Sequence, residues 1–200
     1  MIHEAMPKVA YPQVRSRGTF GGSIAHADPS AELVAASVAL RGRFRLRRRG
    51  TERWIPAEEF FVGLFTTVLE PDELLLEVAL PPMPPRSGWS FLEVARRHHD
   101  FALVGVSAVV ALDAQDRCEQ ARLVYFSVGD GPVEAHQAEA LLMGQVPTLE
   151  AIRDTAELAG DADVDPNSDI NASSDYRRHL VKVLGRRALG EAVERARSSS

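Results

Sequence analysis

The sequence is poor in the residue types and patterns on which many common sites depend. Only one of its 200 residues is a cysteine, Cys118, and a lone cysteine cannot form an internal disulfide or hold an iron–sulfur cluster. No apolar run approaches the roughly 18 residues of a membrane-spanning helix, and the N-terminus lacks a signal-peptide core. We therefore expect a soluble protein of the reducing cytoplasm with no membrane span.

The motifs of several enzyme classes are also missing. The chain has no Walker A loop, no Rossmann glycine pattern and no serine on a nucleophile elbow. His98 and His99 are adjacent on a predicted strand end, so they would point to opposite faces and could not share one metal ion. The acidic stretch 161–169 is similar to a calcium loop, but Pro166 replaces the required glycine and Ala172 the final glutamate. We predict no metal site and no catalytic nucleophile.

Basic and acidic residues are nearly balanced in number over the whole chain, but the basic residues are concentrated in one segment. The 23 basic and 28 acidic residues give a net charge of −5, which argues against a nucleic-acid-binding protein. Seven arginines nevertheless lie between Arg41 and Arg53, alternating with Phe44 and Leu46 in the period of a half-buried strand. We predict the outer face of a strand, which is either solvated or a docking patch for another subunit.

Four prolines in residues 81–85 divide the chain into two blocks. After a proline-broken lead-in at 1–14, the first block is predicted to form a helix, a hairpin turning at Gly50, a short helix and a strand, at residues 33–40, 43–55, 56–61 and 74–80. The second block is predicted to form three strands, then helices around a polar loop at 161–174, with strands at 89–96, 101–112 and 122–128 and helices at 133–143, 148–158 and 176–196. Strands followed by helices indicate an α+β fold with an antiparallel sheet of at least three strands.

A glycine-rich stretch near the start is the strongest local signal. Gly18, Gly21 and Gly22 lie within five positions, which lets the backbone take positive φ and lets a ligand approach closely. Ser23 and Asp28 follow, and we predict that both cap helix starts. A glycine turn that leads into a helix presents free N–H groups and the positive end of the helix dipole, which suits a phosphate or diphosphate. The alternative is a tight loop that only caps a core helix.

The exact string in this stretch carries a family resemblance. From Arg15 to Glu32 it reads Arg-x-Arg-Gly-Thr-x-Gly-Gly-Ser-x-Ala-His-Ala-Asp-Pro-x-Ala-Glu. This string resembles the second flavin-binding loop of the medium, FAD-carrying subunit of molybdenum hydroxylases, the family of aerobic carbon monoxide dehydrogenase and the xanthine dehydrogenases. Three later segments resemble further parts of that subunit in the same order: Glu70–Val78, Phe91–Arg97 and Asp175–Arg178.

The resemblance implies two domains and an FAD site. Residues 1–82 would be the second lobe of a PCMH-type FAD-binding domain, and residues 86–197 a domain like the C-terminal domain of the carbon monoxide dehydrogenase flavoprotein. Glu32 matches an acidic position that hydrogen-bonds the flavin polyol, Leu75 an apolar contact, and Phe101 a position close to the isoalloxazine ring. The implied FAD-binding residues are Thr19, Phe20, Gly21, Gly22, Ser23, Asp28, Glu32, Leu75 and Phe101.

Two departures from the family pattern shape the expected function. The family's flavin domain opens with another lobe, whose Ala-Gly-Gly-x-Ser loop occurs nowhere in this sequence, and His99 stands where the family usually has glycine. We expect either that another chain supplies that lobe or that FAD binding is impaired. The resemblance also implies an iron–sulfur subunit and a molybdopterin subunit as partners.

Two functions therefore stay open. One is an electron-transferring flavoprotein subunit, which would make the chain part of an oxidoreductase. The other is a non-catalytic interaction module that keeps the fold and binds FAD weakly or not at all.

Overall fold

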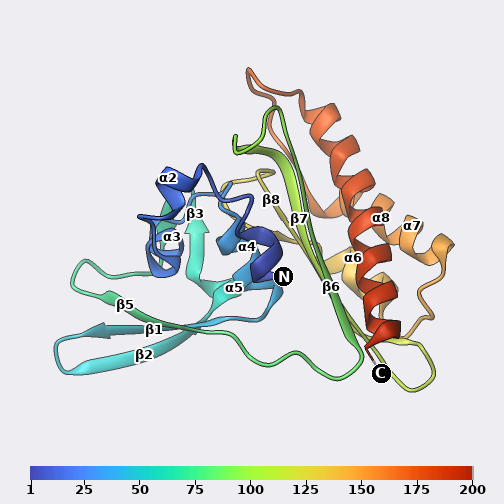
Figure 1. Cartoon of the computed structure of the whole chain (residues 1–200), viewed down its shortest axis with the longest axis horizontal. Helices are drawn as coiled ribbons and strands as arrows, with labels where there is room; N and C mark the ends of the chain where they lie inside the picture. Colours follow the sequence, from blue (N-terminus) through green and yellow to red (C-terminus); the bar gives the residue numbers. More distant parts are fainter. Residues whose placement is uncertain (200) are drawn as a thin grey trace.

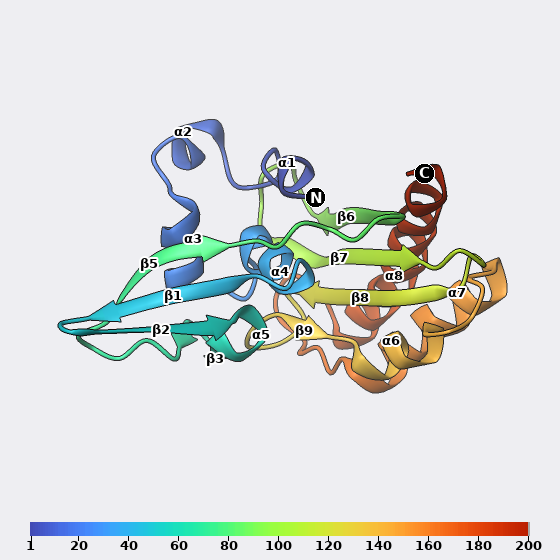
Figure 2. The same cartoon turned by 90° about the horizontal axis from the view of Figure 1, so that it is seen from below.

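A computed structural model describes residues 1–199, which form two regions packed side by side (Figures 1 and 2). The N-terminal region is a group of short helices with two small sheets, and the C-terminal region is a larger antiparallel sheet with helices on one face. This arrangement confirms the predicted α+β class. Within residues 1–199 no helix is long and apolar enough to span a bilayer.

The C-terminal sheet has the strand order β6-β7-β8-β9 and is antiparallel throughout. All eleven residues of β7 are buried, which explains why the sequence here is an unbroken apolar run rather than an alternation. The predicted strand at 101–112 therefore exists, except that Phe101 lies just outside it. The strands are β6 (Ser87–Ala95), β7 (Ala102–Leu112), β8 (Cys118–Phe126) and β9 (Val133–Glu134).

Helices cover one face of this sheet (Figure 1). The longest, α8 (Ser174–Ser198), is capped at its start by Ser173, whose side chain accepts a hydrogen bond from the Tyr176 amide, and it packs along β6 and β7. Several predicted boundaries were wrong. The strand predicted at 122–128 is β8, which begins four residues earlier, at Cys118, and ends at Phe126. The helix predicted at 133–143 begins only at His136, because β9 takes the preceding residues into the sheet, and the loop predicted at 161–174 starts inside a π-helical turn. The remaining elements are α6 (His136–Leu142), α7 (Leu149–Leu158) and the turn η1 (Ala159–Asp163).

The N-terminal region covers the opposite face. Phe91 of β6 and Phe126 of β8 belong to the same buried cluster as Phe44, Leu46 and Phe60 of the first region. The two regions therefore share a core, and the sheet is buried on both faces.

The N-terminal region contains a three-stranded antiparallel sheet in the order β2-β1-β5. The predicted hairpin and the following strand are confirmed, and Pro56 lies at the N-cap of the predicted short helix. A small two-stranded sheet that follows this helix was not predicted. These elements are β1 (Arg43–Arg48), β2 (Thr51–Pro56), α5 (Ala57–Phe60), β3 (Phe61–Gly63), β4 (Thr66–Thr67) and β5 (Leu74–Ala79), after α1 (Ile2–Ala5) and α2 (Pro12–Arg15) in the lead-in.

The glycine-rich stretch is more helical than predicted. Gly21 and Gly22 lie inside α3 (Phe20–His26), in its first turn, and neither has positive φ. The prediction that Ser23 and Asp28 cap helices was wrong. Thr19 caps α3, whereas α4 (Glu32–Ala39) starts without a side-chain cap and Asp28 accepts a hydrogen bond from Ser30 in the preceding turn. Glycine in a first helical turn needs no unusual φ, so the sequence pattern alone could not separate turn from helix.

Candidate functional site

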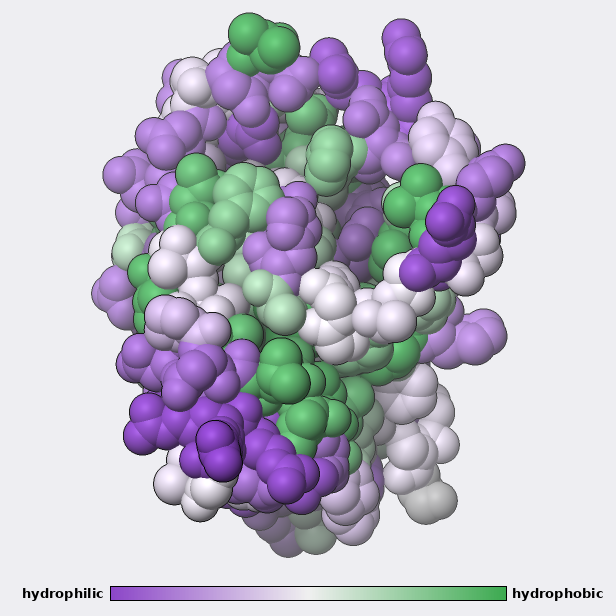
Figure 3. Space-filling view, turned by 90° about the vertical axis from the view of Figure 1, so that its left-hand side faces the viewer, coloured by the Kyte–Doolittle hydropathy of each residue, from purple (hydrophilic) through white to green (hydrophobic). Residues whose placement is uncertain are grey.

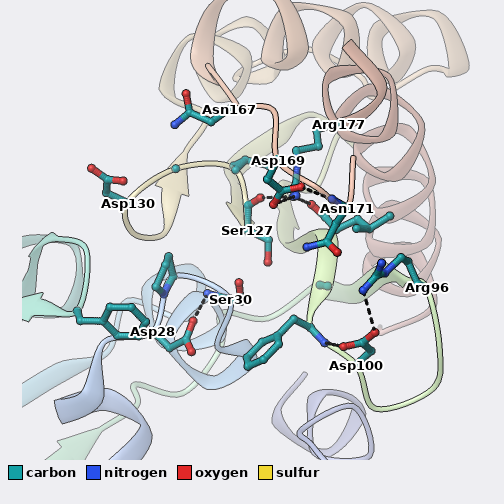
Figure 4. Close-up of a pocket in the computed structure, with 17 residues that line it drawn as sticks. Asp28, Ser30, Arg96, Asp100, Ser127, Asp130, Asn167, Asp169, Asn171 and Arg177 are labelled. Carbon is teal, nitrogen blue, oxygen red and sulfur yellow. Dashed lines mark hydrogen bonds and ion pairs between the residues drawn. The ribbon is translucent and has the colours of Figure 1, made fainter. Parts of the chain in front are cut away.

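A cavity of about 440 Å³ lies between the two regions (Figure 4). Asp28 lies on its N-terminal side (Figure 4). Phe101 also lines the cavity, and 71% of this residue is exposed. Phe65, 52% exposed, also lines the cavity, and its ring lies 5.2 Å from that of His26. Two large aromatic faces are thus open to a ligand in one cavity, an arrangement typical of sites for flat ring systems.

The wall on the C-terminal side is held by one buried arginine. Arg177, near the start of α8, donates to the carbonyl oxygens of Leu103 and Ser127 and to Asp169 at 2.7 Å. Backbone amides that donate to Asp169, together with Arg177, lower the pKa of its carboxyl to about 2. The carboxylate is therefore ionised at neutral pH, and the wall is rigid and polar.

A second cavity, of about 330 Å³, lies between the start of α3 and the strand β5. Phe20 and Gly21 line it from the helix, and Leu75 lines it from the strand. A seven-residue helix is about 10 Å long at 1.5 Å per residue, and Asp28 follows its C-terminal end, so α3 connects the two cavities.

The start of α3 leaves donors available. The Thr19 hydroxyl accepts from the Gly22 amide at 2.9 Å, whereas within residues 1–199 no acceptor faces the amides of Phe20 and Gly21. A methyl group on Gly21 would meet only Leu75, at 4.0 Å, so the space beside the α-carbon of this residue is open. At Gly22 the same methyl group would come within 2.8 Å of the Thr19 hydroxyl that caps the helix.

Glu32 lies at the first position of α4 in an electrostatically unusual setting. Burial, followed by repulsion from Glu93 and Asp28, raises the pKa of the Glu32 carboxyl from 4.5 to about 7. Burial also raises the pKa of Glu93, whose Oε2 atom is buried without a hydrogen-bond partner. No pattern in the sequence indicated a role for Glu93. This residue comes close to Glu32 only because β6 packs against the N-terminal region.

The nine predicted residues are therefore divided between neighbouring places. Asp28 and Phe101 line the cavity between the regions, and Phe20, Gly21 and Leu75 line the second cavity. Thr19 and Gly22 are exposed at the start of α3, Ser23 is half-buried within it, and Glu32 is half-buried at the start of α4.

The acidic loop before α8 has a structural use. Asp163 accepts hydrogen bonds from the amides of Gln137 and Ala138, each at 3.0 Å, at the start of α6. Asp165 forms an ion pair with Arg178 at 3.2 Å. These carboxylates tie the loop to two helices.

One group of potential metal ligands was not predicted. Glu134, His136 and Glu139 have ligand atoms within 4.8 Å of one another. The Arg122 guanidinium contacts Glu134, and Glu139 accepts from the Leu123 amide at 2.7 Å. Because a guanidinium already balances the carboxylates, this group functions as an ion-pair network.

The chemical groups around α3 are of the types that bind the parts of FAD. The open space beside the α-carbon of Gly21 suits the close approach of a diphosphate, and uncharged amide donors at a helix start suit its negative charge. The exposed ring of Phe101 suits the face of an isoalloxazine, and a partly buried carboxyl such as that of Glu32 suits a polyol hydroxyl.

Comparison with known proteins gives matches over nearly the whole chain. Residues 1–83 match the FAD-binding domain of molybdopterin dehydrogenases, and residues 89–192 match the C-terminal domain of the carbon monoxide dehydrogenase flavoprotein. The chain is 36% identical, over 197 residues, to the 6-hydroxypseudooxynicotine dehydrogenase complex subunit alpha of Paenarthrobacter nicotinovorans, covering 98% of this chain and 66% of that protein. It is 31% identical to the carbon monoxide dehydrogenase medium chain of Hydrogenophaga pseudoflava, covering 98% and 67% of the two chains.

Solved structures agree. Carbon monoxide dehydrogenase from Hydrogenophaga pseudoflava, in a form that lacks the Mo-pyranopterin moiety, matches with a TM-score of 0.93 and 32% identity over 98% of this chain and 67% of the other. Quinoline 2-oxidoreductase from Pseudomonas putida 86 matches with a TM-score of 0.88 and 34% identity, over 96% of this chain and 66% of the other. The chain spans about two thirds of the length of the relatives it matches. It belongs to the family of FAD-binding medium subunits of molybdenum hydroxylases.

Proposed function

We propose that this chain binds FAD along α3 and serves as the electron-transferring flavoprotein subunit of a molybdenum hydroxylase. The observation that carries the proposal is the pair of cavities at the two ends of α3, one beside unpaired amides and the other beside exposed aromatic rings. Gly21 would hold the diphosphate and Phe101 would contact the isoalloxazine. Five of the residues predicted from the sequence line the two cavities and would contact this one ligand: Phe20, Gly21, Asp28, Leu75 and Phe101.

The protein's part is to bind and orient the cofactor. FAD supplies the redox chemistry when bound, because it accepts and releases electrons. Thr19 holds the first turn of α3 so that the amides ahead of it point outward, and Leu75 excludes water from one side. Glu32, with its raised pKa, is positioned to donate or accept a hydrogen bond at the polyol.

The proposal includes partner subunits, because the iron–sulfur clusters of such a complex need more cysteine ligands than this sequence provides. Its one cysteine is buried, and burial raises the pKa of the Cys118 thiol to about 11, so it is a poor metal ligand. Electrons would therefore reach this chain from an iron–sulfur subunit and ultimately from a molybdopterin subunit that oxidises the substrate. We also propose that residues 1–82 and 86–197 act as the two functional parts of the chain, that a further polypeptide segment completes the FAD cradle, and that the complex works in the cytoplasm.

The test is a titration of FAD into the purified chain, and a measurement of flavin content in the complex purified after co-expression with the neighbouring subunits. We expect stoichiometric flavin in the complex. Gly21→Ala should weaken FAD binding by about tenfold or more, or ~1.4 kcal/mol, because the new methyl group projects into the cavity beside Leu75 without touching the protein closely.

Gly190→Ala is the matched control. It adds the same methyl group inside α8, where nothing lies within 4 Å, so FAD binding should not change. Equal FAD affinity in Gly21→Ala and the wild type would refute the proposed pose.

The alternative function is a non-catalytic interaction module. This module would keep the fold and the surfaces that dock other subunits, and it would bind FAD weakly or not at all. A complex that assembles normally but carries no flavin would favour this alternative over the electron-transfer function.

A further inference from the structure

The outer face of the β1–β2 hairpin is built differently from the rest of the surface. Successive side chains of a strand point to opposite faces, so Arg43, Arg45 and Arg47 share one face while Phe44 and Leu46 point into the core. The antiparallel register places Trp54 of β2 directly opposite Arg45 on that same outer face. The hairpin extends from the body of the protein (Figures 1 and 2).

Trp54 is a large side chain on an open sheet face. It is 38% exposed, and its ring is flanked by the guanidinium carbons of Arg43 and Arg45 at 5.4 and 5.8 Å from the ring centre. The two cations hold the indole in place on the surface. Tryptophan and arginine are the residue types that most often dominate the binding energy of protein interfaces.

The hairpin is also strongly cationic within an acidic chain. Residues 43–56 contain six arginines and one glutamate, whereas the whole chain has a net charge of −5. Arg45 and Arg47 pair with Glu52 and Glu77, but within residues 1–199 no carboxylate pairs with Arg43, Arg48 or Arg49. Figure 3, seen from the side to which the hairpin points, shows hydrophilic side chains gathered on the lower part of this face beside a hydrophobic group.

We infer that this face, made of Arg43, Arg45, Arg47 and Trp54, with Arg49 in the adjoining turn, is a docking surface for an acidic face of another subunit of the complex. The inference rests on the proposed function, which requires such subunits. Trp54 is the anchor that enters an apolar pocket of the partner, and the unpaired arginines meet carboxylates at its rim.

The same face is less suited to other occupants. Two copies of it would repel each other, because like charges would meet across a symmetric contact. Glu52 and Glu77 stand among the arginines and interrupt the track that a phosphate backbone would follow, and Trp54 is the one aromatic side chain on this outer face. A protein surface of mixed polarity meets this pattern better than a nucleic acid does.

The experiment measures binding of the full chain to the iron–sulfur and molybdopterin subunits encoded beside it, by biolayer interferometry over a range of salt concentrations. Trp54→Ala should weaken the affinity at least about tenfold. Arg43→Glu should slow association several-fold at low salt and flatten the salt dependence. Arg186→Glu, on the exposed side of α8, makes the same charge change away from the hairpin and should bind like the wild type.

Each outcome separates the two proposals. If both hairpin variants bind the subunits with the affinity of the wild type, this inference is overturned and the proposed function stays intact. If the wild-type chain binds neither subunit, the partners named in the proposed function are wrong, and the docking inference fails with them. If the wild type binds a single-stranded RNA 20-mer and the two hairpin variants lose that binding while they still bind the subunits, the surface is reassigned to nucleic acid. Circular dichroism checks that the variants fold.

Discussion

The two larger sheets of this protein are both antiparallel, but their environments are opposite. The sheet β6–β9 is covered by helices on one face and by the N-terminal region on the other, so that every residue of β7 is buried. The sheet β2-β1-β5 is covered on one face only, and its other face shows arginines and Trp54 to solvent. The first sheet holds the two regions together, and the second leaves one face of charged and aromatic side chains open to solvent.

The difference has an energetic meaning. Burial of apolar surface contributes roughly 25 cal/mol per Å², so the stability of the chain is concentrated where the two core clusters meet on β6–β8. The cavity residues and the outer face of β1 contribute little to folding and are free to serve binding. Three substitutions test this division, in decreasing order of expected effect on stability.

Phe126→Ala should be the most damaging change. Phe126 is fully buried and stacks on Phe91 with ring centres 5.5 Å apart, so its removal should lower the free energy of unfolding by about 4 kcal/mol. Phe101→Ala removes the same atoms from a residue that is 71% exposed at the cavity and should change stability by less than about 0.5 kcal/mol. Urea unfolding measures both, and similar losses would erase the proposed division between core and site.

Gly88→Ala should follow. A methyl group at Gly88 of β6 would lie 1.9 Å from the carbonyl oxygen of Ala192 in α8, and a helix backbone cannot move aside as a side chain can. We expect a loss of about 3 kcal/mol through overpacking. Gly190→Ala adds a methyl group to the same helix in open space and should stabilise the chain by about 0.5–1 kcal/mol. Equal behaviour of the two variants in urea would show that α8 does not pack this closely on β6.

Glu32→Gln should have the smallest effect, and one that depends on pH. Because the folded-state pKa of about 7 lies above the ordinary 4.5, the folded chain binds this proton more tightly than the unfolded chain does. Stability from this group is therefore greatest below about pH 4.5 and is lost as the pH rises through about 7. At pH 8 the variant should be more stable than the wild type by up to about 3 kcal/mol, and near pH 4.5 the two should differ little.

Urea unfolding of both proteins across this pH range gives the comparison, in which the other titrating groups cancel. Glu73 and Asp169, whose pKa values are lowered to about 2, are present in both proteins, so their contributions cancel as well. A difference between wild type and variant that does not change with pH would contradict a buried, proton-binding Glu32.

Much of the chain's local structure could be predicted, for an identifiable reason. The alternation at Arg43–Arg48 and the unbroken apolar run of β7 are periodic signals that reflect burial directly. The predictions were wrong where contacts with other parts of the chain determine the local structure. β9 pairs with β8 and replaces the start of a predicted helix, and Thr19 rather than Ser23 caps α3 because the helix begins earlier than the glycines indicate. His99 adopts a φ of 67°, which accounts for the glycine that the family usually has there.

The sequence by itself determined most of the longer elements, the fold class and the family, because each depends on local periodicity or on an ordered string of residues. Through that string it also predicts an FAD site at the Thr19–Glu32 stretch. Only the tertiary structure decided that Phe101 faces Asp28 across one cavity, that Glu93 lies near Glu32, and that Trp54 lies between two arginines. These are contacts between residues far apart or on neighbouring strands, and they are fixed by register and packing rather than by any pattern along the chain.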